Sequence, residues 1–377
     1  MDPFAILPTE IILLILESCC DFTSLNGLQQ ISPRVEQVFN TSYKTITEHV
    51  LKKCSLTSEG LHKQFALLAS VEYTTFTPTT VLEQLYGLSG KAVRPVSISS
   101  INSLAAVRQA VETAAKVHIY ACACLQHLLC RVESAKPRHP IASATDVLSW
   151  VRGSLPEPKS ETFQMTVDPP SWIEYYRTHR GLWNLELFDH IYNAASTRWS
   201  WSTYDLENFV EQYVEWCQYM WGQEEVQAIS ECVYDLCPTE PTTLSHRFPF
   251  LIAVPSPADL TLRTCCHLPM APTDTQVDTM WGRGRSTAQS KNNVLQYYNM
   301  LRGGQNGPLN PLLKLDFKAF RRVGIPLWDK WRMYQMGLMD QSRDVLSPEG
   351  NVVGGELDRI ERPRLAESGD ILEEFGK

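Results

Sequence analysis

The sequence has little of what marks a secreted, membrane-spanning or nucleic-acid-binding protein. It opens on Met1 and Asp2 without a basic segment, so we expect no secretory signal. No apolar run approaches the roughly 20 residues that a membrane span needs. The net charge is −8, and no Lys/Arg stripe with interleaved aromatics is present. These absences predict a soluble protein of the cytoplasm or nucleus, with neither nucleic acid nor membrane as a partner.

Short motifs of enzymes and metal sites are also missing. A nucleophile elbow, H-E-x-x-H and the nucleotide fingerprints are all absent, which predicts a protein that is not an enzyme and uses no cofactor. The eleven cysteines include no C-x-x-C pair, and reduced thiols are expected. Two histidines and three cysteines lie between His118 and Cys130, but helical geometry turns Cys124 and His127 away from the face of His118. Core cysteines and surface or capped histidines are therefore the interpretation here, in preference to zinc.

What the chain does have is helical periodicity. Apolar spacings of three and four predict several helices after the first fifty residues: Leu61–Glu72, Pro78–Leu85, Asn102–Glu133, Thr145–Val151, Thr287–Leu301, Phe317–Val323 and Pro326–Gly337. The best strand candidate limits β structure to a short element near 248–262. The predicted fold is mainly α: a bundle at 1–50, a helical body at 51–346 and a flexible, charge-rich tail at 347–377.

Aromatic residues gather in the segment from Trp172 to Asp235, at spacings that favour helices. A core seldom uses so many Trp and Tyr, and these residues are favoured at protein interfaces. We weigh two roles for this segment and favour substrate recognition over plain core. The pairs Asp189-His190 and Glu224-Glu225 are interpreted as a solvated face. The basic, Gly-rich stretch Gly282–Ser286 lacks the spacing of a phosphate cradle and is interpreted as a loop.

The first fifty residues predict three short helices. Pro8 suits the first turn of a helix that extends to about Cys19. This helix is apolar on nearly every side. One apolar stripe consists of Ile11, Leu14 and Ile15, and the positions beside it are also apolar: Ile12, Leu13 and Leu16. Asp21 or Thr23 can cap the second helix, and Ser32-Pro33 opens the third. So small a bundle rarely stands alone, so it must dock on the body or on another protein.

The bundle resembles an F-box. The resemblance covers residues 3–50 and lies in these residues: Leu7-Pro8-x-Glu10-Ile11-x-x-x-Ile15-Leu16, then Leu25, Leu28, Ser32 and Phe39. Val35 stands where many members of the family carry a bulky aromatic residue. An F-box followed by a long helical body without repeats is similar to many fungal F-box proteins.

F-box proteins bind the Skp-type adaptor of SCF (cullin–RING) ubiquitin ligases, and the rest of the chain recruits the substrate. The resemblance therefore implies a substrate-recognition subunit, linked through the Skp-type adaptor to a cullin, with an unknown protein as its substrate. It assigns partner binding to ten residues: Leu7, Pro8, Ile11, Leu14, Ile15, Leu25, Leu28, Ser32, Val35 and Phe39.

Two alternatives stay open. One is a non-catalytic helical scaffold whose N-terminal bundle packs internally. The other is an enzyme whose catalytic groups converge from distant positions in the aromatic segment, where no motif would reveal them.

Overall fold

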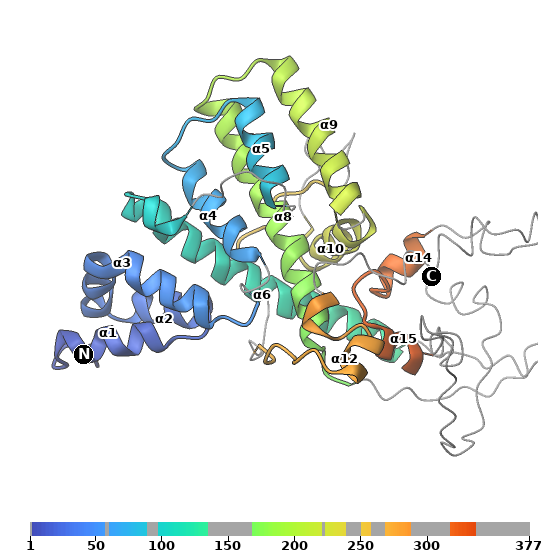
Figure 1. Ribbon diagram of the computed structural model, residues 1–377, viewed down its shortest axis with the longest axis horizontal. Coiled ribbons are helices and arrows are strands. Elements are labelled where there is room, and N and C mark those ends of the chain that lie inside the picture. Colours follow the sequence, from blue (N-terminus) through green and yellow to red (C-terminus); the bar gives the residue numbers. More distant parts are fainter. Residues whose placement is uncertain are drawn as a thin grey trace, which may run out of the picture. The chain divides into compact units, whose positions relative to one another are not determined.

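The computed structural model describes residues 2–56, 60–88, 97–134, 168–220, 223–238, 250–257, 268–287 and 317–336. Every regular element in these ranges is a helix, which confirms the predicted mainly helical fold (Figure 1). Of the β element expected near 248–262, the described part at 250–257 forms no strand. Among the described helices, none combines the length and apolarity needed to cross a membrane.

The chain divides into two compact units. The first combines Met1–Leu125 with Tyr175–Ala271, and the second combines Gln126–Glu174 with Pro272–Lys377. Residues 1–50, predicted as a separate bundle, belong to the first unit. Each unit is described by itself below.

The first helix, α1 (Thr9–Ser18), begins one residue later than predicted. Pro8 has ψ of 147°, so it precedes the helix instead of forming its first turn. Its carbonyl oxygen still accepts the first helical hydrogen bonds, from the amides of Ile11 at 3.1 Å and Ile12 at 3.2 Å. Pro8 therefore acts as the N-cap, where its missing amide costs nothing.

The next two helices begin at the residues that the capping patterns indicate. Asp21 caps α2 (Phe22–Ile31) by accepting a backbone amide at 2.7 Å. Ser32 caps α3 (Pro33–Lys53), accepting the amide three residues later at 3.1 Å, and proline occupies the first helical position. A kink at Ser42, with φ −128° and ψ 21°, divides α3 into two helical segments.

Helices α1, α2 and α3 pack together around a shared apolar core (Figure 1). The core takes residues from all three helices: Ile12 and Leu16, Phe22 and Leu25, then Val35, Val38, Phe39, Ile46 and Val50. The order of caps and apolar positions in the sequence thus gives the predicted three-helix bundle.

The rest of the first unit consists of six further α-helices and one short 3-10 helix among the described residues. They are α4 (Leu61–Val71), α5 (Pro78–Leu88), η2 (Ile98–Ser100), α6 (Leu104–Ser134), α8 (Trp172–Thr197), α9 (Thr203–Met220) and α10 (Gln223–Leu236), with α6 and α8 each contributing residues to both units. Helix α8 is buried on every side over residues 171–188. It is a central helix, although its sequence is rich in charged residues.

The second unit contains short helices. They are α12 (Gln276–Met280), η4 (Arg285–Thr287), α14 (Lys318–Arg322) and α15 (Lys330–Gln335). The helix predicted to begin at Pro326 begins instead at Lys330. Gly324 has φ +76°, which directs the chain into a turn, and the carboxylate of Asp329 accepts the amide of Arg332 at 2.8 Å as the cap.

Some predictions fall on residues that the structure does not describe. These are the helix at 145–151, most of the helix at 287–301 and the tail at 347–377. The division of the chain into bundle, body and tail stays a prediction.

Candidate functional site

Helix α1 has one buried stripe and one exposed stripe. Ile12 and Leu16, four residues apart, are fully buried in the bundle core. Ile11 and Leu14 lie on the other side, with 43% and 59% of their surface exposed. The all-round apolar character of α1 therefore reflects two faces, of which its own bundle covers one.

The ten residues assigned to partner binding divide by burial. The three exposed residues are Pro8, Ile11 and Leu14. The three half-buried residues are Leu7, Ile15 and Leu28. The four buried residues are Leu25, Ser32, Val35 and Phe39. The exposed three can touch a partner directly, whereas the buried four hold the bundle together. Sequence reasoning missed two further exposed apolar residues, Ile6 at 91% and Ile31 at 60%. Their signal was position, since one precedes Leu7-Pro8 and the other precedes the Ser32 cap.

The segment before α1 is fastened to the start of α3. The Asp2 carboxylate accepts the amide of Phe4 and the hydroxyl of Ser32, both at 2.8 Å. These hydrogen bonds, that from Phe4 foremost, lower the pKa of Asp2. Arg34 donates to the Thr9 hydroxyl at 2.7 Å across the same junction. The exposed apolar residues of α1 are therefore presented in a fixed position.

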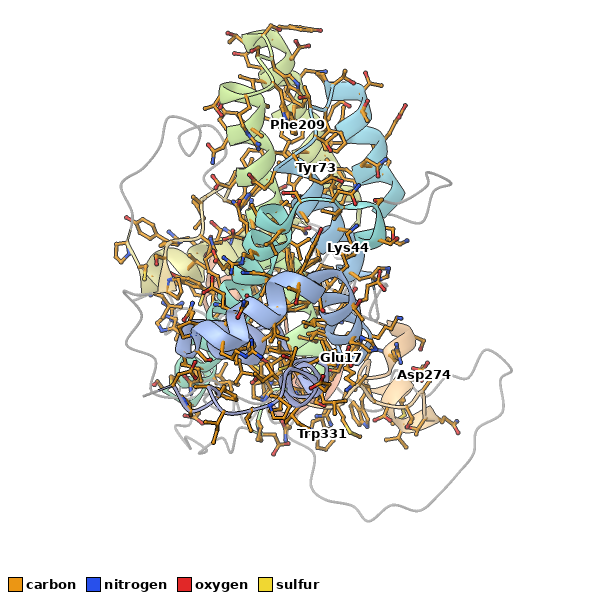
Figure 2. The ribbon with its side chains drawn as sticks, turned by 90° about the vertical axis from the view of Figure 1, so that its left-hand side faces the viewer. Glu17, Lys44, Tyr73, Phe209, Asp274 and Trp331 are labelled. Carbon is orange, nitrogen blue, oxygen red and sulfur yellow. The ribbon has the colours of Figure 1, made fainter. Side chains whose placement is uncertain are left out.

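Another side of the bundle is attached to the body of the first unit. Phe22 stacks on Phe65 of α4, with ring centroids 4.9 Å apart. Lys44 donates to the Asn102 side chain at 2.6 Å, near the start of α6. Figure 2 labels Lys44 and also Glu17, whose backbone oxygen accepts from the Lys53 ammonium at 2.8 Å within the bundle. The bundle thus has both a covered and an uncovered side.

The aromatic segment is core and not a recognition surface, contrary to the role that we favoured. Four of its tryptophans are buried: Trp172, Trp183, Trp199 and Trp216. Phe188, Phe209 and Tyr213 stack with one another at centroid distances of 5.1 to 5.9 Å. Only Tyr204 and Tyr234 are exposed among the large hydrophobic residues described there. Stacking between helices explains why aromatics were so frequent.

The histidine and cysteine cluster of α6 is a buried hydrogen-bonded chain. The Nδ1 of His179 lies 2.8 Å from the carbonyl of Tyr175, so this nitrogen carries the proton and Nε2 accepts. His118 then donates from Nδ1 at 3.2 Å, and its Nε2 lies 3.7 Å from the Cys122 thiol. Cys122 and Cys124 are buried, as predicted for core cysteines, whereas Cys130 is exposed and His118 is buried, contrary to the prediction. Within the described ranges, no three His, Cys, Asp or Glu residues are grouped as metal ligands.

One pair expected on a solvated face is partly buried. Glu225 is buried and forms an ion pair with Arg180 of α8 at 2.5 Å. Periodicity could not show this, because the partner comes from another helix. His190 is half-buried, 3.1 Å from Glu72. Glu225 and Glu72 thus both make polar contacts with side chains of α8.

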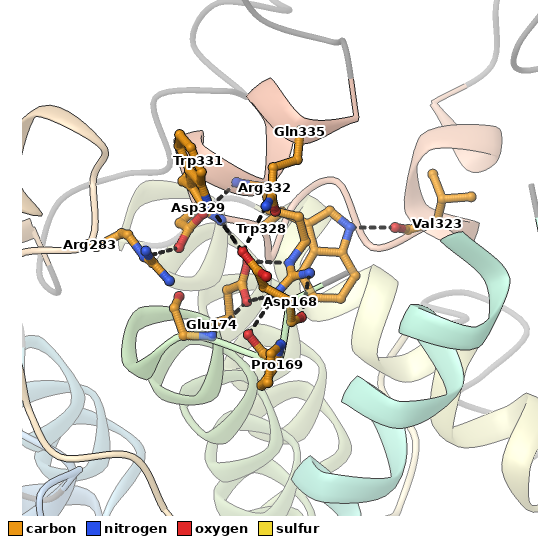
Figure 3. A network of polar contacts seen from close by, with 11 residues as sticks. Asp168, Pro169, Glu174, Arg283, Val323, Trp328, Asp329, Trp331, Arg332 and Gln335 are labelled. Atoms are coloured by element: carbon orange, nitrogen blue, oxygen red, sulfur yellow. Dashed lines mark hydrogen bonds and ion pairs between the residues drawn. The ribbon is translucent and has the colours of Figure 1, made fainter. Parts of the chain in front are cut away.

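A buried ionic network organises the second unit (Figure 3). Arg332 of α15 holds Glu174 of α8 with two bonds, at 2.7 and 2.8 Å. Asp329 forms an ion pair with Arg283 at 2.9 Å, and the Asp168 side chain accepts from Gln335 at 2.7 Å. Burial raises the pKa of Glu174, and the nearby Asp329 adds to this effect. Glu174 and Asp329 each pair with an arginine, and these two ion pairs form a structural clamp within the second unit.

Comparisons with protein-family models, with curated proteins and with solved structures find no match to this chain. The described residues form only helices as regular elements, and the clearest candidate site among them is the exposed apolar stripe of α1. The resemblance to an F-box rests on the residues quoted above and stays a prediction.

Proposed function

We propose that this protein is a substrate-recognition subunit of an SCF-type ubiquitin ligase, bound to a Skp-type adaptor through its N-terminal bundle. The observation that supports the proposal is the exposed apolar stripe of α1. Ile11 and Leu14 project from a helix whose opposite stripe is fully buried. Exposed apolar residues gathered on one rigid element are typical of a protein-interaction surface.

The attachment of the bundle to the body fits the same proposal. Phe22 and Lys44 join it to the first unit, while the stripe of α1 stays exposed. A protein that links an adaptor to a substrate needs both features. The body would carry the substrate, and through the adaptor the complex would reach a cullin. The expected compartment is the cytoplasm or nucleus.

Co-purification with a Skp-type adaptor tests this proposal. Burying a leucine side chain contributes about 1.5–3 kcal/mol, and a buried aspartate adds a desolvation cost. Leu14→Asp should therefore weaken adaptor binding by at least about 30-fold, because 1.4 kcal/mol is a factor of ten. Since Leu14 is exposed, the variant should unfold at the wild-type denaturant concentration. Tyr204 is an exposed residue of α9, and Tyr204→Asp is the matched control, which should bind the adaptor like wild type.

Wild-type affinity in the Leu14→Asp variant would contradict the proposal. The same holds if Leu7→Ala combined with Pro8→Ala has no effect on binding. A folded control that binds while both variants fail places the adaptor on the α1 face.

The alternative, a scaffold whose bundle packs internally, draws on the Phe22–Phe65 stack. It predicts that deleting residues 1–50 leaves an insoluble body and that no adaptor binds. This alternative gives no role to the exposed stripe of α1.

A further inference from the structure

The basic loop Gly282–Ser286 follows α12 and includes the first two residues of the short 3-10 turn η4, and it has no part in the proposed function. It is folded inward through its backbone. The amides of Arg283 and Gly284 both donate to the carbonyl of Asp278, at 2.7 and 2.9 Å. The amide of Ser286 donates to the Asp274 carboxylate at 2.8 Å. These amides are therefore not free to cradle an anion.

Two side chains of the same loop are exposed, those of Ser286 and Arg285. Arg283 is half-buried, with its Nε 2.9 Å from the Asp329 carboxylate. Two arginines thus stand one and three residues before an exposed hydroxyl that lies in the 3-10 turn η4, outside the α-helices. Protein kinases select substrates by the pattern of charge around the acceptor hydroxyl. This is the pattern that arginine-directed serine/threonine kinases bind.

We propose that Ser286 is a phosphorylation site for an arginine-directed kinase. In the reaction, the Ser286 oxygen forms a bond to the γ-phosphorus of ATP as the bond to the β–γ bridging oxygen breaks. ADP leaves, and the hydroxyl proton passes to a base of the kinase. The product carries a charge of about −1.5 to −2 at neutral pH, whereas the Ser286 hydroxyl was neutral.

Other serines also follow basic residues but lack the same setting. Ser97 is exposed and has Arg94 three positions before it, but Val96 precedes it directly and its hydroxyl lies 2.9 Å from that of Ser99. Ser134 has Arg131 three positions before it, yet it lies in α6 and its hydroxyl donates to a backbone carbonyl at 2.6 Å. Ser55 follows Lys52 and Lys53, and its hydroxyl donates to the carbonyl of Pro269 at 3.1 Å. Ser286 combines exposure, a position outside the α-helices and two arginines within the three residues before it.

The phosphate would change the contacts of its own loop. It would stand beside the Asp274 carboxylate, which accepts the Ser286 amide, and the two negative charges would repel. It would also compete with Asp329 for Arg283, since guanidinium groups bind phosphate with paired hydrogen bonds. Phosphorylation should therefore loosen the loop and release one contact of the buried clamp.

The test uses the full chain, Mg-ATP and the catalytic subunit of cAMP-dependent protein kinase, with mass spectrometry to map the site. We expect one phosphate on Ser286, none there in Ser286→Ala, and a roughly tenfold slower rate in Arg285→Gln, whose exposed side chain can change without unfolding the loop. Thr287→Ala is the matched control and should be labelled like wild type. Hydrogen exchange over residues 274–286 should become faster after phosphorylation.

An absence of phosphate on Ser286, or equal incorporation in the Ser286→Ala variant, would overturn the proposal. Labelling of Ser55 or Ser134 in place of Ser286 would do the same. Unchanged hydrogen exchange in the phosphorylated protein would overturn the predicted loosening of the loop.

Discussion

Gly181 of α8 lies close against a buried side chain of α10. A Cβ atom at this position would come 2.1 Å from the Cδ1 of Ile229, a fully buried residue of α10. Gly27 of α2 offers the opposite case, since its Cβ would meet nothing within 4 Å. Both glycines are inside helices of the first unit. The same substitution, glycine to alanine, should therefore change the free energy of unfolding in opposite directions.

The magnitudes follow from two competing effects. Alanine is about 1 kcal/mol better than glycine inside a helix, so Gly27→Ala should raise the free energy of unfolding by about 0.5–1 kcal/mol. At Gly181 the same gain is offset by overpacking. An inserted methyl that displaces a buried side chain costs about 1–3 kcal/mol, and here Ile229 must leave its position or α10 must move. The difference between the two effects is a net loss of up to about 2 kcal/mol for Gly181→Ala.

Urea unfolding followed by tryptophan fluorescence measures both changes. A double-mutant cycle strengthens the test. Ile229→Val removes the Cδ1 atom and alone costs about 0.5–1.5 kcal/mol. Combined with Gly181→Ala it should cost less than the sum of the two, because the methyl now has room. If Gly181→Ala stabilises the protein as Gly27→Ala does, the close approach of α8 and α10 is refuted.

Two further predictions concern buried charges. Arg332→Met should destabilise the second unit by about 3–5 kcal/mol in thermal unfolding, because Glu174 stays buried without its partner. Adding Glu174→Gln should recover part of this loss, and a double variant as unstable as the single one would contradict the pairing. His179 has its pKa lowered to about 3 by burial, with His118 adding to the effect. This folded pKa lies below the ordinary value of 6.5. The contribution of the neutral His179 to the free energy of unfolding is therefore complete above about pH 6.5 and is lost as pH falls toward 3. His179→Gln should flatten the pH dependence of the free energy of unfolding in that range, and an unchanged slope would sink the argument.

The sequence by itself determined where many helices begin and end. Asp21, Ser32 and Pro33 mark helix starts that depend on hydrogen bonds to amides three residues away, and such local chemistry is written in the sequence. The same holds for α6, whose long apolar period predicted its extent within two residues at either end. Pro326 misled because proline also suits turns, and the carboxylate of Asp329 supplied the actual cap.

Tertiary structure decided which faces are buried and which residues pair. The apolar positions of α1 surround the helix, and its packing on α3 leaves Ile11 and Leu14 exposed while Ile12 is buried. In the second unit, Glu174 meets Arg332 across 158 residues of chain. No periodicity reports such a contact, because it depends on the long-range path of the backbone and not on the spacing of neighbours. Local hydrogen bonds thus define the helices of this protein, and long-range packing decides which of their faces stay exposed.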